Sequence, residues 1–171
     1  IEKTVFGGER NAHKYIEKGE SFVIVTHVSP DGDAIGSALG LFHFLNAYGK
    51  ENVSVIVPND YPNFLKWMPG TKDVTIYEKY PEFSEQLISD ADVIFCLDFN
   101  DPKRIEKLAD PVLKSEARKV LIDHHLHPVE FCNVTMSYPN ISSTSEMVFR
   151  FICRMGLFDL IDKNAAECIY T

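Results

Sequence analysis

The stretch that decides the fold reads Val23-Ile-Val-Thr-His-Val-Ser-Pro-Asp-Gly-Asp-Ala-Ile-Gly-Ser37. It begins as an apolar, β-branched run typical of a buried strand, which ends in His27, Asp31 and Asp33. An apolar pattern with helical spacing follows, and Asp33 is the expected N-cap of that helix. Carboxylates between a buried strand and a helix need partners or solvent, so they contribute little to a core. The stretch therefore predicts a site at the end of a strand.

Two later stretches repeat this arrangement. The apolar run from Val93 ends in Asp98, and the run from Val120 ends in Asp123, His124 and His125. In open parallel sheets ligands bind beyond the carboxyl ends of the strands, so we expect the three strand ends to supply one shared site. A set of imidazoles and carboxylates without thiolates suits Mn²⁺, Mg²⁺ or Fe²⁺, and less exclusively Zn²⁺. We interpret the three strand ends as a metal site for phosphoester hydrolysis.

The rest of the chain alternates strand and helix patterns, which predicts an α/β fold: a mostly parallel sheet with helices on both faces, in a Rossmann-like three-layer domain. The expected strands are 21–26, 53–57, 73–77 at an edge, 93–97, 119–122 and 131–136. The expected helices are 8–19, 33–48, 62–68, 82–90, 102–108, 111–117, one from the capping box Ser143-Thr-Ser-Glu146 to Met155, and one that starts near Lys163.

Composition limits the class of protein. The chain has 171 residues, of which 45% are hydrophobic and 25% charged, as in an ordinary globular domain. Its net charge of −8 argues against a protein that wraps a long nucleic acid, although short phosphate substrates remain compatible with it. No recognisable signal peptide and no bilayer-length apolar run are present, and the four cysteines form no CxxC pair. These features favour reduced thiols, no membrane partner and a cytoplasmic location.

The strand-end motifs resemble those of a known family. The segments His27-Val-Ser-Pro-Asp-Gly-Asp33, Leu97-Asp98 and Asp123-His124-His125 look like the first three motifs of the DHH phosphoesterases, and Ser142–Glu146 also resembles that family. The sequence Pro-Asp-Gly-Asp followed by Ala-Ile-Gly-Ser-Ala is most similar to the nanoRNase and pAp-phosphatase branch. The similar family-II pyrophosphatases usually carry Thr at the position of Gly32.

The resemblance implies a role for each motif residue. It implies two ions, usually Mn²⁺, with Mg²⁺ or another divalent metal as substitute. One ion would be held by His27 and Asp31, the other by Asp33 and His124, and Asp98 would bridge them. Asp123 would orient its neighbours, and His125 would contact the scissile phosphate, so Asp98, Asp123 and His125 are the expected catalytic residues. Ser143 and Ser145 are further expected substrate contacts, although helix capping alone explains them.

The family pattern also continues beyond this chain. A further aspartate, in a Thr-Asp-Thr-Gly segment, and a smaller substrate-binding domain normally follow, whereas the chain stops at Thr171 and starts with Ile1 rather than Met. We therefore expect residues 1–171 to be a DHH catalytic domain truncated at its C-terminus.

The function expected is metal-dependent hydrolysis of short oligonucleotides and 3′-phosphorylated nucleotides such as pAp, by a water activated at the binuclear site. The alternatives are a linear or cyclic dinucleotide phosphodiesterase and a pyrophosphatase or exopolyphosphatase. A nucleotide sensor without activity is the alternative outside the enzymes. The expected partners are the short nucleotide substrate and, in a homodimer, a second copy of the chain.

Overall fold

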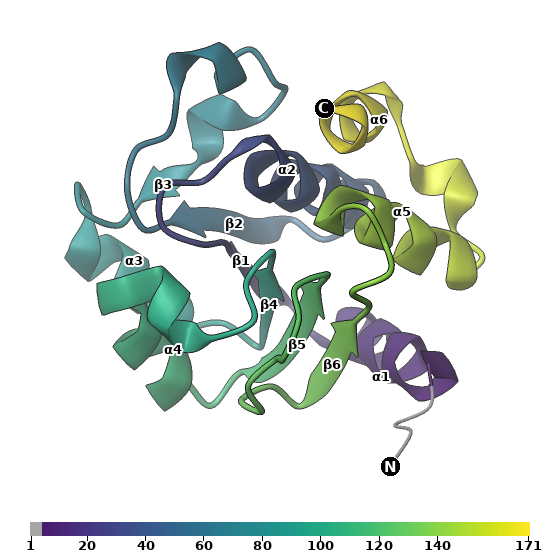
Figure 1. Ribbon diagram of the computed structural model, residues 1–171, viewed down its shortest axis with the longest axis horizontal. Helices are drawn as coiled ribbons and strands as arrows, with labels where there is room; N and C mark the ends of the chain where they lie inside the picture. Colours follow the sequence, from purple (N-terminus) through teal and green to yellow (C-terminus); the bar gives the residue numbers. More distant parts are fainter. Residues whose placement is uncertain (1–4) are drawn as a thin grey trace.

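The computed structural model describes residues 5–171, so residues 1–4 of the expected domain lie outside the described part (Figure 1). The strands are β1 (Ser21–Val25), β2 (Asn52–Val57), β3 (Thr75–Ile76), β4 (Val93–Leu97), β5 (Arg118–Asp123) and β6 (Val134–Ser137). The α-helices are α1 (Val5–Lys18), α2 (Gly32–Ala47), α3 (Pro81–Ser89), α4 (Ala109–Lys114), α5 (Thr144–Arg154) and α6 (Lys163–Tyr170). The 3₁₀ segments are η1 (Asn63–Leu65), η2 (Thr71–Asp73), η3 (Pro102–Leu108) and η4 (Phe158–Leu160).

The strands form one parallel sheet in the order β3-β2-β1-β4-β5-β6. The central strand β1 lies between β2 and β4, and its Ile24 is in register with Val55 on one side and Phe95 on the other. The direction of strand addition reverses between β1 and β4, which is where open α/β sheets bind their ligands. The predicted fold class, a parallel sheet in a three-layer α/β domain, is confirmed.

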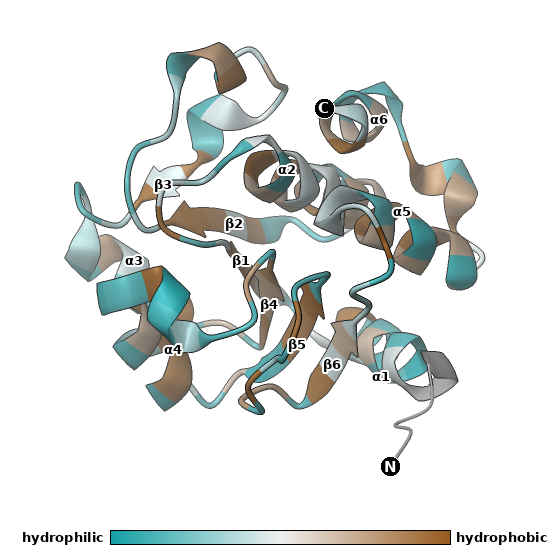
Figure 2. Cartoon of the chain, in the orientation of Figure 1, coloured by the Kyte–Doolittle hydropathy of each residue, from teal (hydrophilic) through white to brown (hydrophobic). Residues whose placement is uncertain are grey.

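Alternate residues of each strand enter two hydrophobic cores, one on each face of the sheet. Phe22, Ile24 and Phe95 pack on one face with α1, α2 and α5, whereas Val23 and Ile94 pack on the other with α3, η3 and α4. Strand β4 is accordingly hydrophobic throughout and appears brown in Figure 2, as does most of β2, whereas β3 is pale and β5 includes hydrophilic residues. Both faces are covered by helices, as a parallel sheet requires.

Helix α2 is buried along most of its length, because it packs against both the sheet and the helices α5 and α6. Two glycines permit the contact with α6. A Cβ atom at Gly36 would lie 2.6 Å from the carbonyl oxygen of Cys168, and one at Gly40 would lie 2.6 Å from Cγ1 of Ile169. These positions fix the distance between the two helices, and α2 in turn carries site residues at its N-terminus.

The structure differs from the sequence-based expectations mainly in short segments. Strand β3 has only two residues, although it lies at the expected edge. Of residues 62–68 only Asn63–Leu65 form a 3₁₀ turn, and residues 102–108 are 3₁₀ rather than α-helical. Segment η3 is interrupted at Glu106, whose φ of 47° departs from helical geometry. Among the described residues, no helix has both the length and the apolar character needed to span a bilayer.

Candidate metal centre

The three strand ends predicted to share a site meet at one edge of the sheet. The chain leaves β1, β4 and β5, which are neighbours, and enters three loops at their carboxyl ends. The site residues lie in these loops, at the last residue of β5 and in the first turn of α2, at the reversal point of the sheet (Figure 1). This arrangement follows from the parallel topology, which places all carboxyl ends of the strands on the same side.

The loop after β1 carries His27 and Asp31. His27 is only 6% exposed, and its Nδ1 lies 2.8 Å from the carbonyl oxygen of Val28, to which it donates a hydrogen bond. Nε2 lies 3.3 Å from Asp98 Oδ2 and 3.9 Å from Asp31 Oδ1. It donates to Asp98 when the ring carries both protons, and it would offer its lone pair to a metal ion when the ring is neutral. Burial lowers the pKa of His27, but its hydrogen bond to Asp98 outweighs that effect and the net pKa is raised.

The expectation that Asp33 caps helix α2 is wrong. Asp31 is the N-cap: its backbone is extended and its carboxylate accepts a 3.0 Å hydrogen bond from the amide of Ala34. The helix begins at Gly32, two residues earlier than a cap at Asp33 implies, and this places Asp33 inside the first turn.

Asp33 is bound instead by the N-terminus of α5. Its two carboxylate oxygens each accept a 2.8 Å hydrogen bond, one from the amide of Thr144 and one from the amide of Ser145. Burial and the negative charge of nearby Asp98 raise the pKa of Asp33, against the opposing effect of these two amides. Two carboxylates that repel each other in a buried site are stabilised by a cation between them.

Asp98 is the centre of the cluster. It is 2% exposed, and its φ of 63° lies in the left-handed region, which Asp and Asn tolerate better than most residues. Its Oδ1 accepts a 2.9 Å hydrogen bond from the hydroxyl of Thr144 and lies 3.5 Å from His124 Nε2. Burial raises the pKa of Asp98, but the hydrogen bonds from His27 and Thr144 outweigh it, and the net pKa is lowered. The carboxylate is thus held in its charged form.

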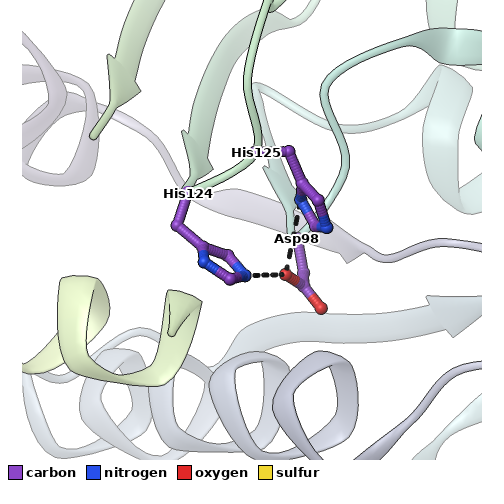
Figure 3. A group of neighbouring side chains, drawn as sticks. All are labelled: Asp98, His124 and His125. Atoms are coloured by element: carbon purple, nitrogen blue, oxygen red, sulfur yellow. Dashed lines mark ion pairs between the residues drawn. The ribbon is translucent and has the colours of Figure 1, made fainter. Parts of the chain in front are cut away.

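The two histidines after β5 have different surroundings, although both rings point toward Asp98 in Figure 3. His124 Nε2 lies 3.5 Å from Asp33 Oδ2 as well as from Asp98. His125 Nδ1 lies 2.6 Å from Oδ1 of the fully buried Asp123, and its Nε2 accepts a 3.2 Å hydrogen bond from Arg104. His124 is therefore free to act as a ligand, whereas His125 is oriented by a carboxylate behind it.

The side chains form two groups with the spacing of metal ligands. His27, Asp31 and Asp98 form one, and Asp98, His124 and His125 form the other; the ligand atoms of each group lie within 4.8 Å of one another. Asp98 belongs to both groups. The donor set of carboxylates and imidazoles, with no thiolate, fits divalent metals such as manganese.

Three residues contribute contacts that the strand-end motifs do not include. Thr144 was expected only within a capping box, and Ser145 was expected, like Ser143, as a substrate contact that capping alone explains; both residues bind site carboxylates. Arg104 contacts His125 and also accepts a 2.8 Å backbone hydrogen bond from Val28, which ties η3 to the loop after β1. Ser143, an expected substrate contact, is the N-cap of α5 and accepts a hydrogen bond from the amide of Glu146.

Known proteins share this sequence and architecture. Residues 21–171 match the model of the DHH family, N-terminal domain. The chain is 37% identical to the bifunctional oligoribonuclease and PAP phosphatase NrnA of Thermus thermophilus, over 78% of this chain and 37% of that relative. It is 25% identical to the cyclic-di-AMP phosphodiesterase GdpP of Bacillus subtilis, over 78% of this chain and 21% of that protein.

A solved structure is also similar. The crystal structure of an exopolyphosphatase-related protein from Bacteroides fragilis superposes with a TM-score of 0.96 and 56% identity, over the whole of this chain and 50% of the other. The chain thus spans half of that protein and less than half of the two curated relatives. Because the family model covers nearly all of the described residues, the chain belongs to the DHH family as its N-terminal domain.

Proposed function

We propose that this protein hydrolyses phosphoesters in short oligonucleotides and in 3′-phosphorylated nucleotides such as pAp. The observation that carries the proposal is the pair of ligand groups joined by Asp98 at the reversal point of the sheet. The likeness to the Thermus protein, whose name states oligoribonuclease and PAP phosphatase activities, supports the choice of substrate class.

The proposed metal ligands follow from the distances around Asp98. His27 and Asp31 would hold one divalent cation and Asp33 and His124 a second, with Asp98 common to both. We propose Mn²⁺, with Mg²⁺ or another divalent ion as substitute. When bound, two such ions supply Lewis acidity, which polarises a phosphoryl oxygen and acidifies a water molecule.

His125 and Arg104 are the proposed phosphate contacts. Asp123 holds Nδ1 of His125 and so fixes the ring, while Nε2 lies on the side of the Arg104 guanidinium. The other N–H groups of the Arg104 guanidinium suit the charge that develops on phosphoryl oxygens, and His125 would add an N–H at Nε2 when its ring carries a second proton in place of the bond from Arg104. Ser143, the N-cap of α5 and the residue before Thr144, is proposed as a further substrate contact.

Two other activities have specific support. The resemblance to a cyclic-di-AMP phosphodiesterase favours dinucleotide hydrolysis, and that to an exopolyphosphatase-related protein favours pyrophosphate or polyphosphate hydrolysis. Rates of Mn²⁺-dependent hydrolysis of pAp, linear diadenylate, cyclic diadenylate and pyrophosphate separate these candidates. We expect pAp and the linear dinucleotide to react fastest. Preference for pyrophosphate would contradict the proposal, and tight nucleotide binding without turnover of any substrate would identify a sensor.

The variant Asp98→Asn tests the shared ligand. Asn also tolerates the left-handed backbone of this position, so we expect the fold to be retained. We expect turnover to fall by more than the about 10- to 100-fold typical of an outer-sphere substitution, because a ligand to both ions is lost. Asp159→Asn, at an exposed position on η4, is the matched control. Activity of Asp98→Asn near that of the control would disprove a two-ion site.

We also propose a cytoplasmic location, supported by the absence of disulfides among the described residues, where Cys96, Cys132, Cys153 and Cys168 are free. The expected homodimer is tested separately, by sedimentation of the protein at several concentrations.

A further inference from the structure

The segment between β2 and β3 lies beside the metal centre. It leaves the carboxyl end of β2, next to the loop after β1, and runs alongside the N-terminal end of α2 (Figure 1). Two contacts join it to the site loop: Asn59 Oδ1 accepts a 2.6 Å hydrogen bond from the amide of Ser29, and Leu65 lies 3.9 Å from where Gly32 would carry a Cβ. Gly32 separates Asp31 from Asp33, so this segment touches the turn that carries both carboxylates.

The segment is internally braced. The hydroxyl of Thr71 donates to the carbonyl oxygens of Lys66 and Met68, both at 2.9 Å, and the hydroxyl of Tyr61 donates to the carbonyl of Thr71. His43 of α2 makes a 2.9 Å hydrogen bond to the carbonyl oxygen of Pro69. These contacts hold the turn around η1 in one conformation against α2.

This rigid turn exposes two large aromatic side chains. Leu65 and Met68 are each 2% exposed and anchor the turn in the core, whereas Phe64 is 73% exposed and Trp67 is 60% exposed. Phe64 lies within η1 and Trp67 lies in the turn that follows it, so one short turn presents both exposed rings. Leu65 and Met68 already anchor the turn in the core, so packing of the turn does not require the rings of Phe64 and Trp67.

We propose that Trp67, with Phe64 beside it, is a stacking platform for the base of a nucleotide whose phosphate lies at the metal centre. This inference rests on the proposed function and specifies how the substrate is recognised. An exposed indole on a rigid turn suits a nucleobase, because stacking needs only a planar face and little conformational change. The side chain of the neighbouring Lys66 is bound elsewhere and does not occupy the stacking face of Trp67, since its ammonium lies 3.2 Å from Asp60 and over the ring of Tyr61.

Trp67 is the single tryptophan of the chain, so its fluorescence reports on this turn alone. We expect AMP to quench the emission saturably, and ribose 5-phosphate and inorganic phosphate to leave it unchanged. This titration requires no turnover. Saturable quenching without hydrolysis of any nucleotide would refute the proposed function but keep the platform. Hydrolysis of pAp without quenching would refute the platform but keep the function.

Kinetics of variants provide the second test. Trp67→Ala should raise KM for pAp about 5- to 150-fold, which corresponds to the about 1 to 3 kcal/mol of one stacked base, with kcat unchanged. Trp67→Phe should restore most of the affinity, because it keeps an aromatic face. Phe158→Ala, a matched loss of an exposed ring in the groove between α5 and α6, should leave KM unchanged. The reverse pattern, with KM raised only by Phe158→Ala, would place the base in that groove and overturn the inference.

Discussion

Thr144→Val removes one hydrogen bond from the centre of the site and changes little else. The hydroxyl of Thr144 is fully buried and donates to Asp98 Oδ1 at 2.9 Å. Valine has nearly the same shape and is β-branched too, so the first turn of α5 keeps its packing and no cavity forms. The amide of residue 144, which binds Asp33, is also retained.

The expected magnitude comes from the charge of the acceptor. A hydrogen bond to a charged group is worth about 1.5–3 kcal/mol, more than one between neutral groups. The hydroxyl fixes the orientation of the carboxylate that both ligand groups share, so its loss weakens the binding of each ion. We therefore expect the dissociation constant for Mn²⁺ to rise about 10- to 150-fold, similar to the effect of outer-sphere substitutions in other metal sites.

Isothermal titration calorimetry with Mn²⁺ measures this change directly. Thr144→Ser keeps the hydroxyl and should bind Mn²⁺ almost as tightly as the unaltered protein. Thr135→Val makes the same replacement at an exposed position of β6 and should have no effect. If Thr144→Val bound Mn²⁺ within twofold of the unaltered protein, the orientation of Asp98 by this hydroxyl would be irrelevant to metal binding.

Two further predictions concern other parts of the structure. Asp123→Asn removes the carboxylate that holds His125 Nδ1, so kcat should fall about 10- to 100-fold. Calorimetry should show an unchanged affinity for Mn²⁺. A large loss of affinity would instead make Asp123 a metal ligand. Asp162 is the N-cap of α6, and its carboxylate accepts a 2.8 Å hydrogen bond from the amide of Ala165. Asp162→Ala removes this cap and should lower the free energy of unfolding by about 1 kcal/mol. Thermal unfolding should show a melting temperature about 2–4 °C lower, whereas Asp162→Asn, which keeps the cap, should unfold like the unaltered protein.

The strong strands and the strand-end residues could be predicted from the sequence, because continuous apolar runs and abrupt polar ends are local signals. Strands β1 and β4 match the expected ranges to within a residue. The convergence of His27, Asp98 and His124 followed from a general property of parallel sheets. These features depend on patterns within a few residues of each other.

The remaining features depend on tertiary contacts that leave no local signal. Asp33 was assigned to the cap of its own helix, but its partners are amides more than 100 residues later in the chain. The hydroxyl of Thr144 donates to Asp98, which lies 46 residues earlier in the sequence. The residues around Thr144 indicate only the start of a helix. The short 3₁₀ turns are likewise set by packing rather than by sequence periodicity.

Because Asp33 accepts hydrogen bonds from the first amides of α5, binding of a metal ion at Asp33 would also raise the free energy of unfolding. These hydrogen bonds join the start of α2 to the start of α5, so an ion bound to Asp33 would strengthen contacts between segments distant in the sequence. A ligand that binds only the folded state stabilises it by about 2.7 kcal/mol at a concentration 100 times its dissociation constant. The bound ion would then hold the start of α2 against the start of α5. Proteolysis near residues 138–143, just before α5, should therefore be slower when the ion is bound.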